Sequence, residues 1–63
     1  MTEVKKQRLL HDFTQEYVAK HIGISQTIYS QKEANKVKFS IKEALLMANL
    51  YNTTVEELFK DLK

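Results

Sequence analysis

Residues 14–33 read TQEYVAKHIGISQTIYSQKE, and this stretch carries the clearest structural signal in the chain. It contains Gly23, the only glycine of a sequence that has no proline. Apolar residues recur at helical spacing between Thr14 and the glycine, and Ser25 is a good N-cap for a second helix. Because glycine adopts positive φ without strain, we expect a tight turn at Gly23 between two short helices. This arrangement predicts a helix-turn-helix unit.

Further helices are predicted on both sides of this unit. Cap residues and apolar spacing predict helices at 3–11, 15–22 and 26–34, followed by a loop at 35–39. Ser40–Glu43 and Thr54–Glu57 have the pattern of capping boxes, so two more helices are expected to begin there. Their expected apolar stripes are Ile41, Ala44, Leu45, Ala48 and Tyr51 in the first, and Val55, Leu58, Phe59 and Leu62 in the second. The sequence therefore predicts an all-α, five-helix, single domain over residues 1–63.

Composition excludes several classes of protein. A chain of 63 residues, 43% of them apolar, forms one small domain with a modest core. It has no cysteine, so it is neither a disulfide scaffold nor a Cys-ligated zinc module. It has no long apolar run, so we expect no signal peptide, no membrane span and a cytoplasmic location. We interpret His11 and His21 as surface or helix-end residues, and we expect no enzymatic activity, cofactor, metal or small-molecule ligand.

Charge is distributed unevenly along the chain. Residues 1–42 carry eight basic and four acidic side chains, whereas residues 43–63 carry two basic and four acidic ones. The net charge of +2 is therefore the sum of a basic first part and an acidic last part. One interpretation is that the basic part faces a polyanion, and the other is that these are ordinary solvated charges.

The chain resembles the phage-repressor-like (Cro/Xre-type) helix-turn-helix family over nearly its whole length. The similarity rests on the segment TQEYVAKHIGIS, on Glu33 eight residues after Ser25, and on the ending NTTVEELF, which is similar to the family's frequent GVSLEELL. Within the first segment, the family's four-residue spacing is matched by Gln15, Ala19 and Gly23. The resemblance implies a compact five-helix, lambda-repressor-like DNA-binding domain of phage or mobile-element type. It also implies a structural ion pair between Arg8 and Glu33.

The chain departs from the family pattern at several positions around its third predicted helix. Asn35 stands where the family usually has glycine, and Phe39 replaces a frequent proline. Lys32 occupies a position that usually holds an apolar core residue, and Ile28 replaces a small polar residue. We expect these changes to leave the fold intact and to affect how the third helix packs.

The third predicted helix has the polarity of a base-reading helix. Gln26 and Gln31 can each form two hydrogen bonds with adenine, and the Thr27 methyl can contact a thymine methyl. The resemblance implies base contacts at the start of this helix and one turn later, which match these residues. The candidate base-contacting set is Gln26, Thr27, Ser30 and Gln31. The alternative is that these are merely solvated helix residues.

Phosphate contacts are expected at the ends of the helix-turn-helix unit. Helix N-termini at Gln15 and Ser25 offer free backbone N–H groups to an anion. Lys36 and Lys38 add positive charge in the following loop, and such contacts position a protein without reading sequence. The candidate phosphate-contacting set is Gln15, Ser25, Asn35, Lys36 and Lys38.

The apolar residues near the C-terminus have two interpretations. They can form core, or they can form the interface of a symmetric dimer that places two reading helices about one DNA turn (roughly 34 Å) apart. The candidate interface comprises Leu50, Val55, Leu58, Phe59 and Leu62.

The functional prediction is a sequence-specific regulator of transcription, a repressor, that binds a palindromic double-stranded DNA operator as a homodimer. The alternative is a helix-turn-helix module of the antirepressor or immunity type that binds a protein partner rather than specific DNA. An exposed Ile28 and the modest net charge favour the alternative.

Overall fold

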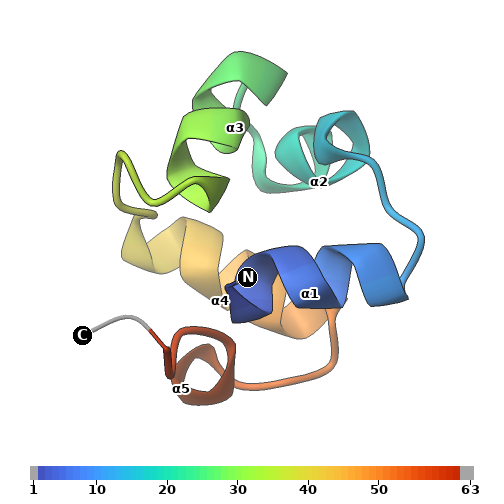
Figure 1. Cartoon of the computed structure of the whole chain (residues 1–63), viewed down its shortest axis with the longest axis vertical. Coiled ribbons are helices and arrows are strands. Elements are labelled where there is room, and N and C mark those ends of the chain that lie inside the picture. The colour runs from blue at the N-terminus through green and yellow to red at the C-terminus, as the bar shows by residue number, and fades with distance from the viewer. Residues whose placement is uncertain (1, 62–63) are drawn as a thin grey trace.

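The computed structural model describes residues 2–61, and within that range the chain consists of helices and turns with no strand. The helices are α1 (Glu3–Leu10), α2 (Gln15–Ile22), α3 (Gln26–Glu33), α4 (Ile41–Leu50) and α5 (Val55–Leu58). Figure 1 shows α2 and α3 together at one end of the molecule and α5 at the other, with α1 and α4 between them. The predicted all-α, five-helix architecture is confirmed.

Each helix begins at a hydroxyl cap. The side chain of the cap accepts a hydrogen bond from the backbone N–H three residues later, which satisfies one of the free donors of the first turn. The five caps are Thr2, Thr14, Ser25, Ser40 and Thr54. The capping box predicted at Ser40 is confirmed, because the Glu43 carboxylate also accepts the Ser40 N–H. At Thr54 only half of the box is present, since Glu57 pairs with Lys60 instead.

Four helices are followed within two residues by a residue with positive φ, and these residues stop the helices in a chain that has no proline. They are Asp12 (57°), Gly23 (82°), Asn35 (64°) and Asn52 (54°). Glycine, asparagine and aspartate are the residues that adopt the left-handed conformation at least cost. A Cβ built on Gly23 would meet no atom within 4 Å, so the backbone conformation alone favours glycine there. The predicted turn at Gly23 is confirmed, and Asn35, which stands where the family usually has glycine, also has the left-handed conformation.

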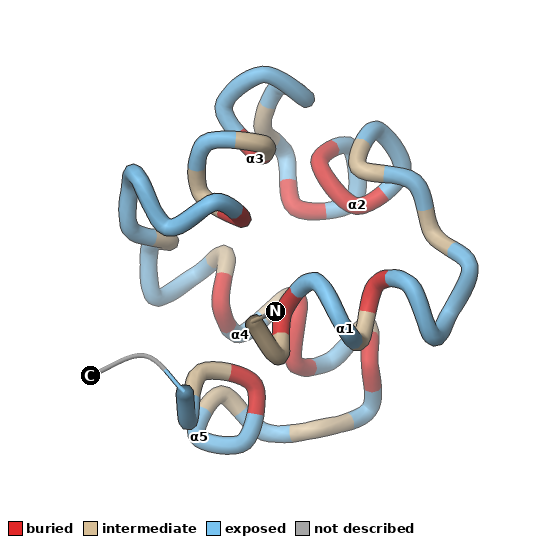
Figure 2. Tube along the Cα trace, viewed as in Figure 1, coloured by how far each residue is buried: buried red, intermediate tan, exposed pale blue. Residues whose placement is uncertain are grey.

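The core lies where the helices meet, and Figure 2 shows the buried segments of the tube turned towards that centre. Its buried members are Val4, Val18, Ala19, Ile22, Tyr29, Met47, Tyr51 and Leu58. Partly buried side chains pack around them, including Phe13, Ile24, Phe39, Leu46, Leu50 and Phe59. Every helix therefore contributes to one shared core, which fixes α2 and α3 relative to the rest.

The predicted apolar stripe of α4 was partly wrong. Ile41 is 82% exposed and Leu45 57% exposed, while Met47 is fully buried. Leu45 precedes Met47 by two residues and therefore lies about 160° from it around the helix. The stripe that packs on the core contains Ala44, Met47, Ala48 and Tyr51. Ile41 and Leu45 form a second apolar face that the fold leaves in solvent.

Candidate nucleic-acid interface

The polar face of α3 is presented to solvent. Gln26, Thr27 and Gln31 are exposed, and Ser30 is half-buried. Tyr29, on the opposite side of the helix, is fully buried in the core. At 100° per residue, the four predicted base-contacting positions span an arc of about 140°. Their amides and hydroxyls are therefore available together on one side of the molecule, where they can both donate and accept hydrogen bonds.

The turn that connects α2 to α3 fixes the position of this face. The Ile24 N–H donates to the Ala19 carbonyl at 3.0 Å, and the Gly23 N–H donates to the Lys20 carbonyl at 3.3 Å. Ser25 then caps α3, and its hydroxyl accepts the Ile28 N–H at 3.2 Å. The helices α2 and α3 pack on each other as well as on the core, and together they form one helix-turn-helix unit.

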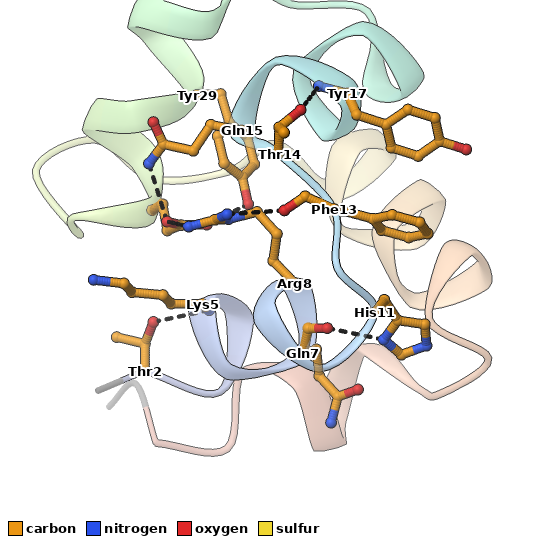
Figure 3. Close-up of polar contacts among 11 residues, drawn as sticks. Thr2, Lys5, Gln7, Arg8, His11, Phe13, Thr14, Gln15, Tyr17 and Tyr29 are labelled. Atoms are coloured by element: carbon orange, nitrogen blue, oxygen red, sulfur yellow. Dashed lines mark hydrogen bonds and ion pairs between the residues drawn. The ribbon is translucent and has the colours of Figure 1, made fainter.

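A buried ion pair ties α3 to α1. Arg8 Nε lies 2.8 Å from Glu33 Oε2, and Arg8 Nη2 lies 3.0 Å from Glu33 Oε1. The third donor group of the same guanidinium, Nη1, donates to the Phe13 carbonyl at 2.9 Å, in the segment between α1 and α2. Figure 3 shows Arg8 extending from α1 towards Phe13, Gln15 and Tyr29. A single arginine side chain therefore links α1, the α1–α2 turn and the end of α3.

Two further donors complete the environment of the Glu33 carboxylate. The Tyr29 hydroxyl donates to Oε2 at 2.6 Å, and the Gln15 side-chain amide donates to Oε1 at 3.1 Å. Burial alone would raise the pKa of Glu33, but the hydrogen bonds from Arg8, Tyr29 and Gln15 outweigh it and lower the pKa. Burial and the hydrogen bond to Glu33 raise the pKa of Tyr29, so its hydroxyl remains a donor. The carboxylate is thus charged and fully satisfied at neutral pH.

Lys32 is accommodated by neighbours that the sequence pattern did not reveal. Its Nζ lies 2.5 Å from Glu43 Oε1 and 5.9 Å from the centre of the Phe39 ring. The side chain is mostly buried, with 11% of its surface exposed. A charged residue can therefore occupy the expected core position of α3, because its ammonium group forms an ion pair with an acid on α4 and lies over an aromatic ring in the loop.

The predicted phosphate-contacting residues lie at the two ends of this unit. Asn35, Lys36 and Lys38 are exposed in the loop after α3, and neither lysine forms an ion pair within residues 2–61. Ser25 is exposed at the start of α3. The side chain of Gln15 is held by Glu33, so at the start of α2 only its backbone N–H remains available to an anion.

Two exposed side chains on the unit were absent from the predicted set. Ile28 is 45% exposed on α3, and Tyr17 is 50% exposed on α2. The Tyr17 ring lies 4.6 Å, centre to centre, from Phe13 and 6.4 Å from His21. Tyr17 precedes Val18, which is fully buried. Successive residues of a helix point about 100° apart, so Tyr17 faces away from the core beside it.

The candidate dimer interface requires a correction. Leu58 is 0% exposed and belongs to the core, so it has no surface left for a second chain. Leu50, Val55 and Phe59 are half-buried and keep some exposed surface. Leu62 lies outside the described residues. Helix periodicity placed Leu58 and Phe59 on one stripe, but the single turn of α5 directs Leu58 inwards.

Other kinds of site have little support in the described part of the chain. Across residues 2–61, no cluster of three or more potential metal ligands occurs, and no helix has the length and apolarity needed to cross a membrane. The His11 Nδ1–H donates to the Gln7 carbonyl, 2.8 Å away, and the centre of the His11 ring lies 5.1 Å from that of Tyr51.

Comparison with known proteins agrees with this geometry. The helix-turn-helix family profile matches residues 4–58. An uncharacterised HTH-type transcriptional regulator of Methanocaldococcus jannaschii is 33% identical over 57 residues, which cover 90% of this chain and 86% of the relative. No solved structure matches the chain significantly. The profile covers all five helices, including the α2–α3 unit with its glycine turn, and the chain therefore belongs to the Cro/Xre-type helix-turn-helix family.

Proposed function

We propose that this chain is a sequence-specific, double-stranded DNA-binding regulator of transcription that reads the major groove with α3. The observation that carries the proposal is the exposed amide and hydroxyl face of α3, held in place by the buried Arg8–Glu33 pair. A major groove admits one α-helix and displays a distinct pattern of donors and acceptors for each base pair. The relative from Methanocaldococcus jannaschii carries the name of a transcriptional regulator, which supports the same function here.

In this proposal the residues of α3 have separate roles. Gln26 and Gln31 are positioned to form paired hydrogen bonds with adenine, and Thr27 contacts a thymine methyl. Ser30 contributes a smaller hydroxyl contact from the same face. Ile28, exposed beside them, adds an apolar contact of the kind that a thymine methyl accepts.

Phosphate contacts orient the helix on the duplex. The free N–H groups at the starts of α2 and α3 face anions favourably, and Lys36 and Lys38 add cationic side chains beyond the end of α3. These groups bracket the polar face from both sides. They supply affinity and register, while the α3 side chains supply sequence preference.

We further propose that the protein acts as a homodimer on a palindromic operator and represses transcription by occupying it. The half-buried Leu50, Val55 and Phe59 provide the apolar surface for the two-fold contact. A two-fold dimer requires half-sites about one helical turn apart, roughly 34 Å.

The test is selection of binding sites from random duplex DNA by the full chain, followed by titration of the best site with wild type and variants. Gln31→Ala should lose about 1–3 kcal/mol of discrimination at one base pair of each half-site, with overall binding retained. Gln7→Ala, which removes a glutamine from α1, is the matched control and should keep the full sequence preference. Failure to enrich any sequence from the random pool would contradict the proposal.

One observation favours a second function. The exposed Ile28 on α3 is an apolar side chain at the edge of the proposed DNA face, about 60° around the helix from Gln31, where it suits a protein partner. A protein-binding module of this kind would enrich no DNA sequence and would lose its partner on Ile28→Asp. Its binding would also respond weakly to salt, whereas phosphate binding weakens steeply as salt rises.

A further inference from the structure

An apolar groove lies away from the polar face of α3, between the α3–α4 loop, α4 and α5. Its volume is 740 Å³. The large apolar side chains that line it are Val37, Phe39, Ile41, Leu45, Val55 and Phe59. In Figure 1 the loop runs from α3 into the start of α4 at the left of the view, and α5 lies below α4. We refer to this feature as the apolar groove.

The groove is open rather than enclosed. Ile41 is 82%, Leu45 57% and Val37 45% exposed, although all three are large apolar residues that line it. Single exposed apolar residues are common on protein surfaces, but a contiguous lined groove marks a binding surface. An open wall of this kind would leave much of a small ligand in water, whereas a helix laid along it would cover all three side chains.

The charged residues that line the groove are all lysines: Lys32, Lys36 and Lys38. Lys32 is neutralised by Glu43, whereas Lys36 and Lys38 are exposed and have no acidic partner within residues 2–61. The edge of the groove is therefore positive. A partner with carboxylates beside its apolar residues complements this edge, and a basic partner is repelled.

We propose that the apolar groove binds an acidic amphipathic helix of a partner protein. Its walls are two helices and a loop, so the groove matches the helix-in-groove mode, in which apolar anchors recur at i, i+3 or i+4, and i+7. No strand edge is available within residues 2–61 to receive an extended peptide by β-pairing. A second copy of this chain is a poorer occupant of the whole groove, because a two-fold contact centred on it would bring its lysines against their own copies. The homodimer contact proposed above shares only Val55 and Phe59, at the α5 wall, with the groove.

Binding of this partner competes with DNA, and this part of the inference rests on the proposed function. Lys36 and Lys38 line the groove and are also proposed phosphate contacts. Carboxylates that pair with these lysines remove cations that the duplex needs, so the acidic helix lowers DNA affinity. The groove then gives the cell a way to release the regulator from its operator.

The experiment uses a display library of random peptides about 15 residues long, enough for four helical turns, panned against the full chain. The most enriched peptide is synthesised, and its affinity is measured by fluorescence anisotropy for wild type, Leu45→Asp and Leu10→Asp. Leu10 is 67% exposed on α1, outside the groove, and makes a matched control for Leu45. Circular dichroism verifies that both variants remain folded, as their exposure predicts.

We expect enriched peptides with apolar residues at helical spacing and an excess of acidic residues. Leu45→Asp should weaken binding at least tenfold, and Leu10→Asp should leave it unchanged. Enrichment of basic peptides, or equal affinities for the two variants, would overturn the proposal. So would sedimentation that shows self-association of wild type abolished by Leu45→Asp, since a second copy would then occupy the groove.

Competition is measured separately, with the operator recovered from the random pool. The peptide should raise the apparent Kd for operator DNA, and simultaneous binding without loss would refute the shared use of Lys36 and Lys38. If the peptide binds but no operator is recovered, the DNA-reading function fails while the groove proposal stands. The two proposals can therefore fail independently.

Discussion

Lys32 on α3 and Glu43 on α4 form an ion pair with 2.5 Å between Nζ and Oε1, and the same oxygen accepts the Ser40 backbone N–H at 3.0 Å. One carboxylate oxygen therefore completes the cap of α4 and binds the last turn of α3. The side chains of the pair are 11% and 14% exposed, so water screens their attraction only in part. Together with Arg8–Glu33, this pair connects the last turn of α3 to both α1 and α4.

Both acidic partners of these pairs make the folded state sensitive to acid. Burial opposes ionisation of Glu33 and Glu43, but hydrogen bonds from Arg8 and Lys32 prevail, so both pKa values are lowered. A carboxyl with a lower pKa in the folded state binds fewer protons there than in the unfolded chain. The stabilisation is thus complete above about pH 4.5, the ordinary value, and is lost as the pH falls through the lowered values. Urea unfolding at stepped pH should show this loss.

A variant separates the contribution of Glu43 from that of Glu33. Lys32→Met removes the hydrogen bond that lowers the pKa of Glu43, so the dependence of unfolding free energy on pH should become shallower. Lys60→Met removes the lysine of an exposed ion pair and should leave that dependence unchanged. Equal acid sensitivity in the two variants would mean that Lys32 does not stabilise the Glu43 carboxylate.

Removing Arg8 should cost far more than removing a surface lysine. In Arg8→Met, the buried Glu33 keeps its charge without its partner, which destabilises by about 3–5 kcal/mol. A small domain has a total stability of about 5 kcal/mol or slightly more, so this variant should be largely unfolded by circular dichroism. Adding Glu33→Gln removes the unpaired charge while the amide oxygen still accepts from Tyr29, so the double variant should regain stability. If the double variant is no more stable than Arg8→Met, the loss of stability in Arg8→Met does not come from the unpaired charge of Glu33.

Substitution of Tyr51, in contrast, is expected to stabilise the folded protein. Its hydroxyl oxygen is buried and has no hydrogen-bond partner among the described residues. Burial, with a smaller contribution from the charge of Glu33, raises the pKa of Tyr51 to about 12, so the group stays neutral. A buried polar group without a partner costs about 1–3 kcal/mol, and Phe has the same ring without the hydroxyl. Tyr51→Phe should therefore raise the urea midpoint, and a lower midpoint would show that the hydroxyl is satisfied.

Local signals were sufficient to predict most of the fold. The caps Thr14, Ser25 and Ser40 and the left-handed Gly23 and Asn35 act within a few residues of themselves, so the sequence alone indicates where helices begin and end. The capping pattern at Thr54 was less reliable because Glu57 had a competing partner in Lys60. Element boundaries follow from such short-range chemistry.

Features that depend on tertiary packing were harder to predict. Glu43 follows Lys32 by eleven residues and lies in a different helix, so no local sequence pattern predicts their ion pair. Periodicity marked Ile41 and Leu45 as core, yet both are exposed, because a short helix in a small domain buries one narrow stripe. The same misassignment concealed the apolar groove. Leu58 shows the opposite error. The sequence pattern allowed it either in the core or at a dimer interface, and the structure places it in the core.

Salt dependence of DNA binding tests the loop lysines. Binding weakens with salt because each neutralised phosphate releases counterions, with a slope of about −0.9 per contact on a log–log plot. The double variant Lys36→Gln/Lys38→Gln should therefore reduce the slope by about 1.8 and preserve sequence preference, since phosphate contacts read no bases. Lys60→Gln is the matched control and should leave the slope unchanged, because Lys60 follows α5, which Figure 1 shows at the end of the molecule away from α3. An unchanged slope in the double variant would mean that neither lysine contacts phosphate, and the duplex would then be oriented by the helix N-termini alone.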